Sequence, residues 1–155
     1  RVVTVTGDGV VNPGNYKVLF GTNQNELIEA AGGLKEGCEK VISGGPMMGF
    51  AMYTTDTPIT KTSSSILCMS KDEVSACEPT ACINCGRCVD ACPSRIIPSR
   101  LADFAERHDE EAFLKFNGLE CVECGSCSYV CPAKRQLKQA IGSMRKTALA
   151  NKKKK

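Results

Sequence analysis

Hydrophobic and polar positions alternate in short runs over the first 70 residues, a pattern typical of β-strands. Val2–Val5 alternates valine with threonine, and Tyr16–Phe20 is a second candidate strand. Lys40–Ser43 and Ser64–Met69 are two further candidates. Glu26–Ala31 has helical spacing, with asparagines before it that can cap a helix and two glycines after it that can end one. Strands, one helix and Gly-rich turns together predict a small α+β unit of the β-grasp type.

The pattern changes beyond a polar connector at residues 71–81. Pro98–His108 and the segment after Asp109 carry apolar residues at helical spacing, and Gly118 can end the second of these helices. A third amphipathic helix is predicted from about Ala133 to Ala150. The sequence thus predicts an α+β chain in three parts. These are a β-grasp domain at 1–70, an α-helical domain at 71–150 and a basic tail at 151–155.

Two copies of one cysteine spacing lie in the helical part. Each reads C-x2-C-x2-C-x3-C followed by proline, which is the bacterial ferredoxin spacing for 4Fe–4S clusters. Three cysteines in one loop wrap one cluster, and the fourth, turned away beside its proline, binds the other. We therefore expect two clusters with crossed ligands. The predicted sets are Cys82, Cys85, Cys88 and Cys131 for the first, and Cys121, Cys124, Cys127 and Cys92 for the second.

Other uses of the cysteines fit the pattern less well. Zinc also binds C-x2-C pairs, but zinc motifs usually separate two such pairs by about a dozen residues or more. Eleven cysteines, an odd number, without a signal peptide argue against a disulfide scaffold and for a reducing compartment. Cys38, Cys68 and Cys77 lie outside the motifs and are expected to be small buried hydrophobes, with a stray thiol that is not a ligand as the alternative for Cys77. No nucleophile–base pair is present, so we predict no catalytic residue.

Charge is informative at one end of the chain. The net charge is +3, and residues 141–155 hold six basic residues and no acidic one. Three interpretations are open: a solvated helix end, contact with an anionic membrane surface or an acidic membrane protein, and nucleic-acid binding. The tail lacks interleaved aromatic residues, so no nucleic-acid partner is predicted. No run approaches the about 18 to 20 apolar residues that cross a bilayer.

In these motifs and in several other stretches, the chain resembles the C subunit of the Rnf complex, the ion-translocating ferredoxin:NAD+ oxidoreductase of bacteria. The most specific stretch is Glu120–Arg135, around the second motif. The other resembling stretches are Val11–Tyr16, Gly21-Thr22, Glu26–Ala30, Ser43–Gly49, Lys61–Ser64 and the first cysteine motif. The resemblance covers nearly the whole chain. It implies a soluble-ligand-binding β-grasp (SLBB) domain followed by an α-helical ferredoxin domain.

The resemblance also implies a function, namely electron relay through two 4Fe–4S clusters in a complex at the cytoplasmic face of the cell membrane. The partners would be the other subunits and a flavin domain earlier in the same chain. The sequence starts at Arg1 without an initiator methionine, so we expect a fragment, with FMN and NADH bound only by the missing N-terminal domain. The SLBB domain is expected to brace that domain. The alternatives are a cobalamin reductase of a bacterial microcompartment, and a ligand-binding module with structural clusters.

Overall fold

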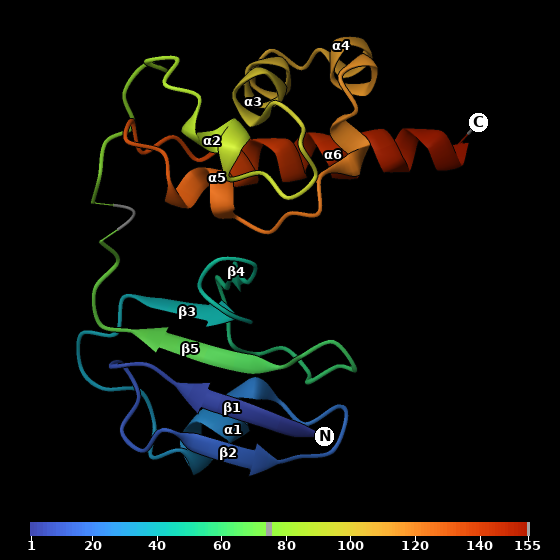
Figure 1. Ribbon diagram of the computed structural model, residues 1–155. Coiled ribbons are helices and arrows are strands. Elements are labelled where there is room, and N and C mark those ends of the chain that lie inside the picture. Colours follow the sequence, from blue (N-terminus) through green and yellow to red (C-terminus); the bar gives the residue numbers. More distant parts are fainter. Residues whose placement is uncertain (74–75, 155) are drawn as a thin grey trace. The chain divides into compact units, whose positions relative to one another are not determined.

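A five-stranded sheet organises the first part of the chain in the computed structural model, which describes residues 1–73 and 76–154. The strand order is β2-β1-β5-β3-β4, with β1 and β5 parallel and the other neighbours antiparallel (Figure 1). The strands are β1 (Val2–Thr6), β2 (Gly14–Lys17), β3 (Lys40–Ser43), β4 (Phe50–Ala51) and β5 (Ser65–Met69). This is the β-grasp arrangement that the alternating pattern predicts.

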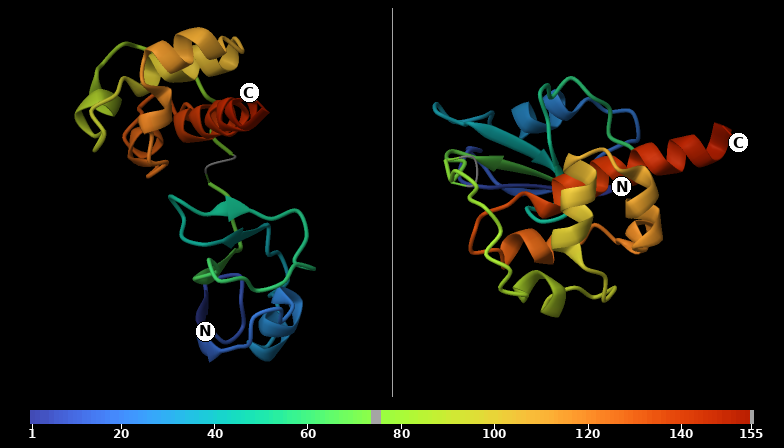
Figure 2. Two further views of the ribbon diagram at one scale, coloured as in Figure 1. Left: turned by 90° about the vertical axis from the view of Figure 1, so that its right-hand side faces the viewer. Right: turned by 90° about the horizontal axis from the view of Figure 1, so that it is seen from above.

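Helix α1 (Gln24–Ala30) covers one face of this sheet, as Figures 1 and 2 show. Alternate residues of a strand point to the same face, and in β1 this places Val3 and Val5 in the core with no exposed area. Leu27 of α1 belongs to the same apolar cluster. Asn23 caps the start of the helix, and its side-chain oxygen accepts a hydrogen bond from the backbone N–H of residue 25 at 2.9 Å. Strand alternation therefore directs apolar side chains into this core, and the cap fixes the start of the helix that packs on it.

The second part of the chain is helical (Figures 1 and 2). Its elements are α2 (Arg87–Asp90), α3 (Pro98–Glu106), α4 (Glu110–Lys115), the 3₁₀ turn η1 (Gly118–Glu120), α5 (Ser126–Tyr129) and α6 (Leu137–Lys154). Leu101 of α3, Phe113 of α4 and Ile141 of α6 have no exposed area and form one core. Asp109 caps α4 as predicted, accepting from the Ala112 N–H at 3.0 Å. The helices between and after the motifs thus share one apolar centre.

The two halves of this helical part repeat each other at an offset of 39 residues. Cys121 follows Cys82 by 39 positions, and α5 and α6 begin 39 positions after α2 and α3. The backbone repeats as well, since φ is 54° at Asn84 and 55° at its counterpart Glu123. The repeated cysteine spacing is therefore one part of a longer structural duplication.

The chain divides into two units by its internal contacts, Arg1–Ala76 and Cys77–Lys155. The α+β class is confirmed, with the sheet in the first unit and the helices between and after the cysteine motifs in the second. The domain limits predicted from the sequence, 1–70, 71–150 and 151–155, stay predictions. Among the described residues, no helix has both the length and the apolar character needed to cross a membrane.

Several predicted bounds were wrong, each for a local reason. β2 lies at Gly14–Lys17, because Leu19 and Phe20 are 81% and 56% exposed and do not belong to a buried strand. The last helix begins at Leu137, since a turn precedes it, with the Lys134 N–H bonded to the Cys131 carbonyl at 3.2 Å. It then continues through the basic residues to position 154. The elements β4, α2, α5 and η1 were missed because two to four residues carry no measurable period.

Gly7 offers a test of the close packing beside β5. Its φ is +109°, and a Cβ there would stand 1.9 Å from the Cys68 carbonyl oxygen. Gly37 also has a positive φ, +84°, but a Cβ there would meet nothing within 4 Å. We expect Gly37→Ala to lower the free energy of unfolding by about 1 kcal/mol, through backbone strain alone. Gly7→Ala should lower it by at least about 2 kcal/mol more. Urea denaturation followed by circular dichroism measures both, and equal losses would contradict the packing.

Candidate metal centres

The first predicted ligand set surrounds a cavity of about 110 Å³. Cys82, Cys85 and Cys88 come from the first motif, and Cys131 comes from the end of the second. The other lining residues are Ile83, Asn84, Gly86, Ser99, Pro132, Ala133, Arg135 and Leu137. The structure therefore brings the crossed combination of thiols to one space.

The second predicted set surrounds another cavity in the same way. Cys121, Cys124 and Cys127 of the second motif line it together with Cys92 of the first. Its volume is about 20 Å³, which is room for about one water molecule. A cluster bonded to these four thiols would require the surrounding loops to widen. Around both cavities, the grouping of thiols is three from one motif and one from the other.

The two cavities are equivalent under the internal duplication. Every residue that lines the first cavity has a counterpart 39 positions away that lines the second. Most pairs have the same charge, such as Gly86 with Gly125. Three pairs differ in charge: Asn84 with Glu123, Ser99 with Lys138, and Arg135 with Ile96. The two sites therefore have equivalent lining positions but differ in the charges of the side chains at three of them.

The backbone of both motifs includes left-handed residues at matching positions. φ is 79° and 84° at Gly86 and Gly125, and it is 53° at both Arg95 and Lys134. Positive φ is uncommon outside glycine and persists where the surrounding fold determines it. Turns of this kind can point successive N–H groups into an anion-binding concavity. One such N–H, that of Glu123, donates to Cys121 Sγ at 3.4 Å. The loops thus suit anionic sulfur.

Burial and hydrogen bonds shift the thiol pKa values of the second motif in opposite directions. Burial raises the pKa of Cys127 to about 11 and also raises the pKa of Cys121. Hydrogen bonds with Ser126 lower the pKa of Cys124, and the Cys124 thiol lies 3.5 Å from the Ser126 hydroxyl. Iron binds thiolates. A metal bound here must therefore itself provide much of the driving force for deprotonating Cys127.

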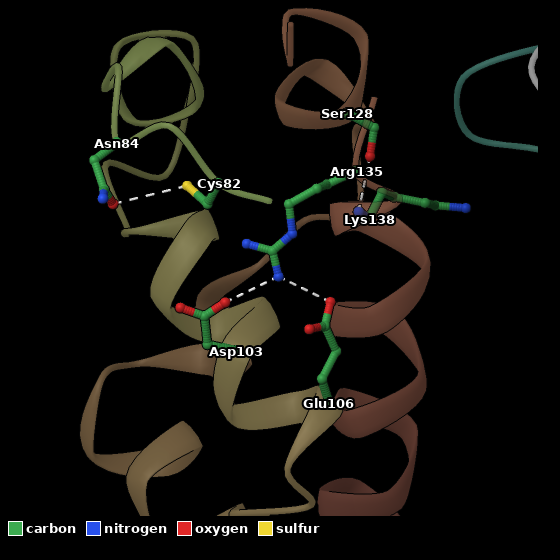
Figure 3. Close-up of polar contacts among 7 residues, drawn as sticks. All are labelled: Cys82, Asn84, Asp103, Glu106, Ser128, Arg135 and Lys138. Carbon is green, nitrogen blue, oxygen red and sulfur yellow. Dashed lines mark hydrogen bonds and ion pairs between the residues drawn. The ribbon is translucent and has the colours of Figure 1, made fainter. Parts of the chain in front are cut away.

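Arg135 brings a fixed positive charge to the first cavity. Its side chain is 11% exposed, and its Nη2 donates to Asp103 Oδ1 and Glu106 Oε1 on α3, both at 2.9 Å (Figure 3). Burial disfavours the charge, but the hydrogen bonds to Glu106 and Asp103 outweigh it and raise the pKa of the guanidinium. Sequence reasoning passed over Arg135. The available signal was its place four residues after Cys131, where the first motif has Ile96.

The second cavity has a different charge pattern. Glu123 lines it and pairs with Arg145 Nη1 of α6 at 3.3 Å. Lys138 lines it as well, and its backbone N–H donates to the Ser128 hydroxyl at 2.9 Å at the start of α6 (Figure 3). The first cavity therefore has a cation where the second has the apolar Ile96, and a neutral amide where the second has a carboxylate.

The three cysteines outside the motifs differ in exposure. Cys68 is buried as expected and Cys38 is half-buried, but Cys77 is exposed because it lies in the polar connector, so that expectation was wrong. Within residues 1–73 and 76–154, no three His, Cys, Asp or Glu side chains lie close enough to hold a single metal ion. A 4Fe–4S cube differs, since each cysteine bonds a separate iron. The donor sets of the two motifs thus fit a cluster by chemistry and grouping.

Comparison with protein families divides the chain in the same way. An SLBB domain matches residues 2–51, and a 4Fe-4S dicluster domain matches residues 81–135. The second unit is therefore an iron–sulfur domain, and the predicted order of an SLBB domain followed by a ferredoxin domain is confirmed.

Three relatives are similar to this chain over most of its length. The C subunit of the Na(+)-translocating ferredoxin:NAD(+) oxidoreductase complex of Acetobacterium woodii is 40% identical over 99% of the chain. The proton-translocating counterpart of Clostridium ljungdahlii is 48% identical over 91% of it. The C subunit of the ion-translocating oxidoreductase complex of Yersinia enterocolitica is 42% identical over 72% of it. The chain spans 35%, 31% and 16% of the lengths of these relatives. The chain belongs to the family of C subunits of the Rnf-type ion-translocating ferredoxin:NAD+ oxidoreductases.

Proposed function

We propose that this chain is the electron-relay part of a C subunit in an Rnf-type ion-translocating ferredoxin:NAD+ oxidoreductase complex. The observation that carries the proposal is the pair of equivalent cavities, each lined by four cysteines. Iron–sulfur clusters, when bound, supply reversible one-electron transfer. The residues of this chain would hold such clusters and set the charge around them.

The crossed ligand sets support this role. Cys82, Cys85 and Cys88 would hold one cluster with Cys131, and the second motif would hold the other with Cys92. Each set shares one cavity, whereas the fourth cysteine of a motif lines the cavity of the other motif. Crossed bonding would tie both clusters to one folded unit, which favours transfer between them.

The relatives extend beyond this chain, and the proposal for the whole protein follows from that. The chain covers about a third of the two relatives from Acetobacterium and Clostridium. We assign FMN and NADH binding to a flavin domain in the remaining length, with the SLBB domain bracing it. The partners would be the other subunits of the complex, at the cytoplasmic face of the cell membrane.

The basic end of α6 supports a peripheral attachment. Lys152 and Lys153 are exposed on this helix. Arg145, by contrast, is held inside the unit by Glu123 and by the Leu119 carbonyl. The exposed lysines at the helix end therefore form the part of this basic segment that fits an anionic membrane surface or an acidic partner protein.

Reversible reduction tests the relay against the ligand-binding module with structural clusters. We expect the anaerobically purified chain to absorb near about 400 nm, to bleach with dithionite and to hold about eight irons. Potentiometric titration followed by EPR should show both clusters reduced and reoxidised within biological potentials. A colourless protein with stoichiometric zinc would overturn the clusters, and clusters that cannot be cycled would favour the structural role.

The crossed sets can be tested by removing the first cluster and finding out whether the second cluster depends on Cys92 or on Cys131. In a chain with Cys82, Cys85 and Cys88 replaced by alanine, we expect about four irons to remain at the second site. Adding Cys92→Ala should then remove the remaining iron, because Cys92 lines that cavity. Adding Cys131→Ala instead is the matched control and should leave it. Iron and sulfide assays decide, and the reverse dependence would show that each motif holds its own cluster.

Arg135 should raise the reduction potential of the first cluster, because reduction adds negative charge beside a fixed cation. We expect Arg135→Gln to lower one of the two potentials by on the order of 50 mV. Arg135→Lys should largely retain it. Arg135→Gln is then made in a chain with Cys121, Cys124 and Cys127 replaced, which should hold only the first cluster. A shift in the remaining potential assigns the effect to the first site. Lys115→Gln, exposed on α4, is the control. Two potentials that stay unchanged in Arg135→Gln would contradict the assignment.

A further inference from the structure

A third cavity, of about 700 Å³, lies within the first unit, among residues that take no part in the cysteine sites. Its volume falls within the range of about 300–1,000 Å³ that is usual for small-molecule pockets. Its walls come from the start of α1, the loop from β3 to β4, β4 itself and the segment that leads to β5. The cavity thus belongs to the β-grasp sheet and its connections.

Gln24 gives this cavity a specific polar group. The side chain is 4% exposed and lines the cavity. Its Nε2 donates to the Thr57 hydroxyl at 3.0 Å, while its Oε1 has no hydrogen-bond partner among the described residues. Buried acceptors are nearly always satisfied, and an unsatisfied one requires an explanation. A hydrogen-bond donor that is not part of this unit would complete the amide.

The fold holds this amide in place. Gln24 is the first residue of α1, and its backbone N–H donates to the Thr57 carbonyl at 2.9 Å. The neighbouring Asn23 forms a β-bridge with Pro58. Backbone and side chain of Gln24 are therefore both fixed to the segment around Thr57. With Nε2 engaged, the group offered to a ligand is a single, preorganised acceptor.

The rest of the lining indicates which ligand chemistry fits. The described lining residues include no charged side chain. Phe50 and Tyr53 line the cavity and are 66% and 102% exposed, so their rings are available to stack on a flat group. Hydroxyl groups form another part of the lining. They belong to Thr54, Thr57, Thr60, Thr62, Ser43, Ser63 and Ser64.

We infer that this cavity binds an uncharged nucleoside. A base N–H would donate to Gln24 Oε1, the base would stack on Phe50 or Tyr53, and the sugar hydroxyls would meet the Thr and Ser hydroxyls. A lining without cations gives a phosphate group no charged partner. The inference is independent of the clusters, because the cavity is built from residues 24–64 alone.

Calorimetric titration of the cluster-loaded chain of residues 1–155 with adenosine, guanosine, cytidine and uridine tests this site. At least one nucleoside should bind saturably, with a Kd below about 1 mM. Its 5′-monophosphate should bind no more tightly. Gln24→Leu should weaken binding at least about tenfold, because it removes the acceptor. Tyr53→Ala should weaken it as well, and this variant leaves the core untouched since Tyr53 is fully exposed.

Glu29→Gln, on an exposed position of α1, is the matched control and should bind as the parent chain does. If Gln24→Leu fails to fold by circular dichroism, Tyr53→Ala decides alone. No saturable binding by any of the four nucleosides would overturn the inference. Unchanged binding in folded Gln24→Leu, or tighter binding of the monophosphate, would overturn it too.

Discussion

The exchange of one cysteine between the two motifs is the constraint on which the second unit depends. Neither motif completes a cavity from its own residues, since Cys131 lines the first and Cys92 lines the second. Helices α3 and α6, which follow the two motifs, also pack together, and the fully buried Leu101 and Ile141 belong to their common core. Metal bonding by these cysteines would therefore stabilise the same arrangement as the apolar packing, which suits a unit with few aromatic residues.

Duplication explains how two sites can share a backbone and still differ in charge. The left-handed positions recur 39 residues apart, so the loops keep their shape. The side chains other than the cysteines can differ between the two sites. The clearest case is Arg135 of the first cavity, whose equivalent in the second cavity is Ile96. Differences of this kind set potentials apart without moving a ligand. The first unit is built in another way, from strand pairing and an apolar core. The amide oxygen of Gln24, which has no partner among the described residues, faces a separate cavity there.

Much of this protein could be predicted from its sequence. The eight candidate ligand cysteines follow from spacing alone, because a local loop geometry needs fixed intervals. Strand β3 was predicted with its observed bounds, and Asp109 as a helix cap, because alternation and capping are local effects. Short elements such as α2 and β4 escaped, because they are set by neighbouring loops and strands rather than by their own residues.

Two features arose only in the tertiary structure. Arg135 lies in the sequence as one more basic residue, and only packing against α3 makes it a half-buried cation beside four thiols. Gln24 lies just before the helix that the sequence predicts, and only the return of the chain at Thr57 buries its amide. The sequence by itself determined which residues are candidate iron ligands, because that depends on local spacing. The tertiary structure decided the charge around them and formed the cavity beside Gln24, because both depend on groups brought together from distant parts of the chain.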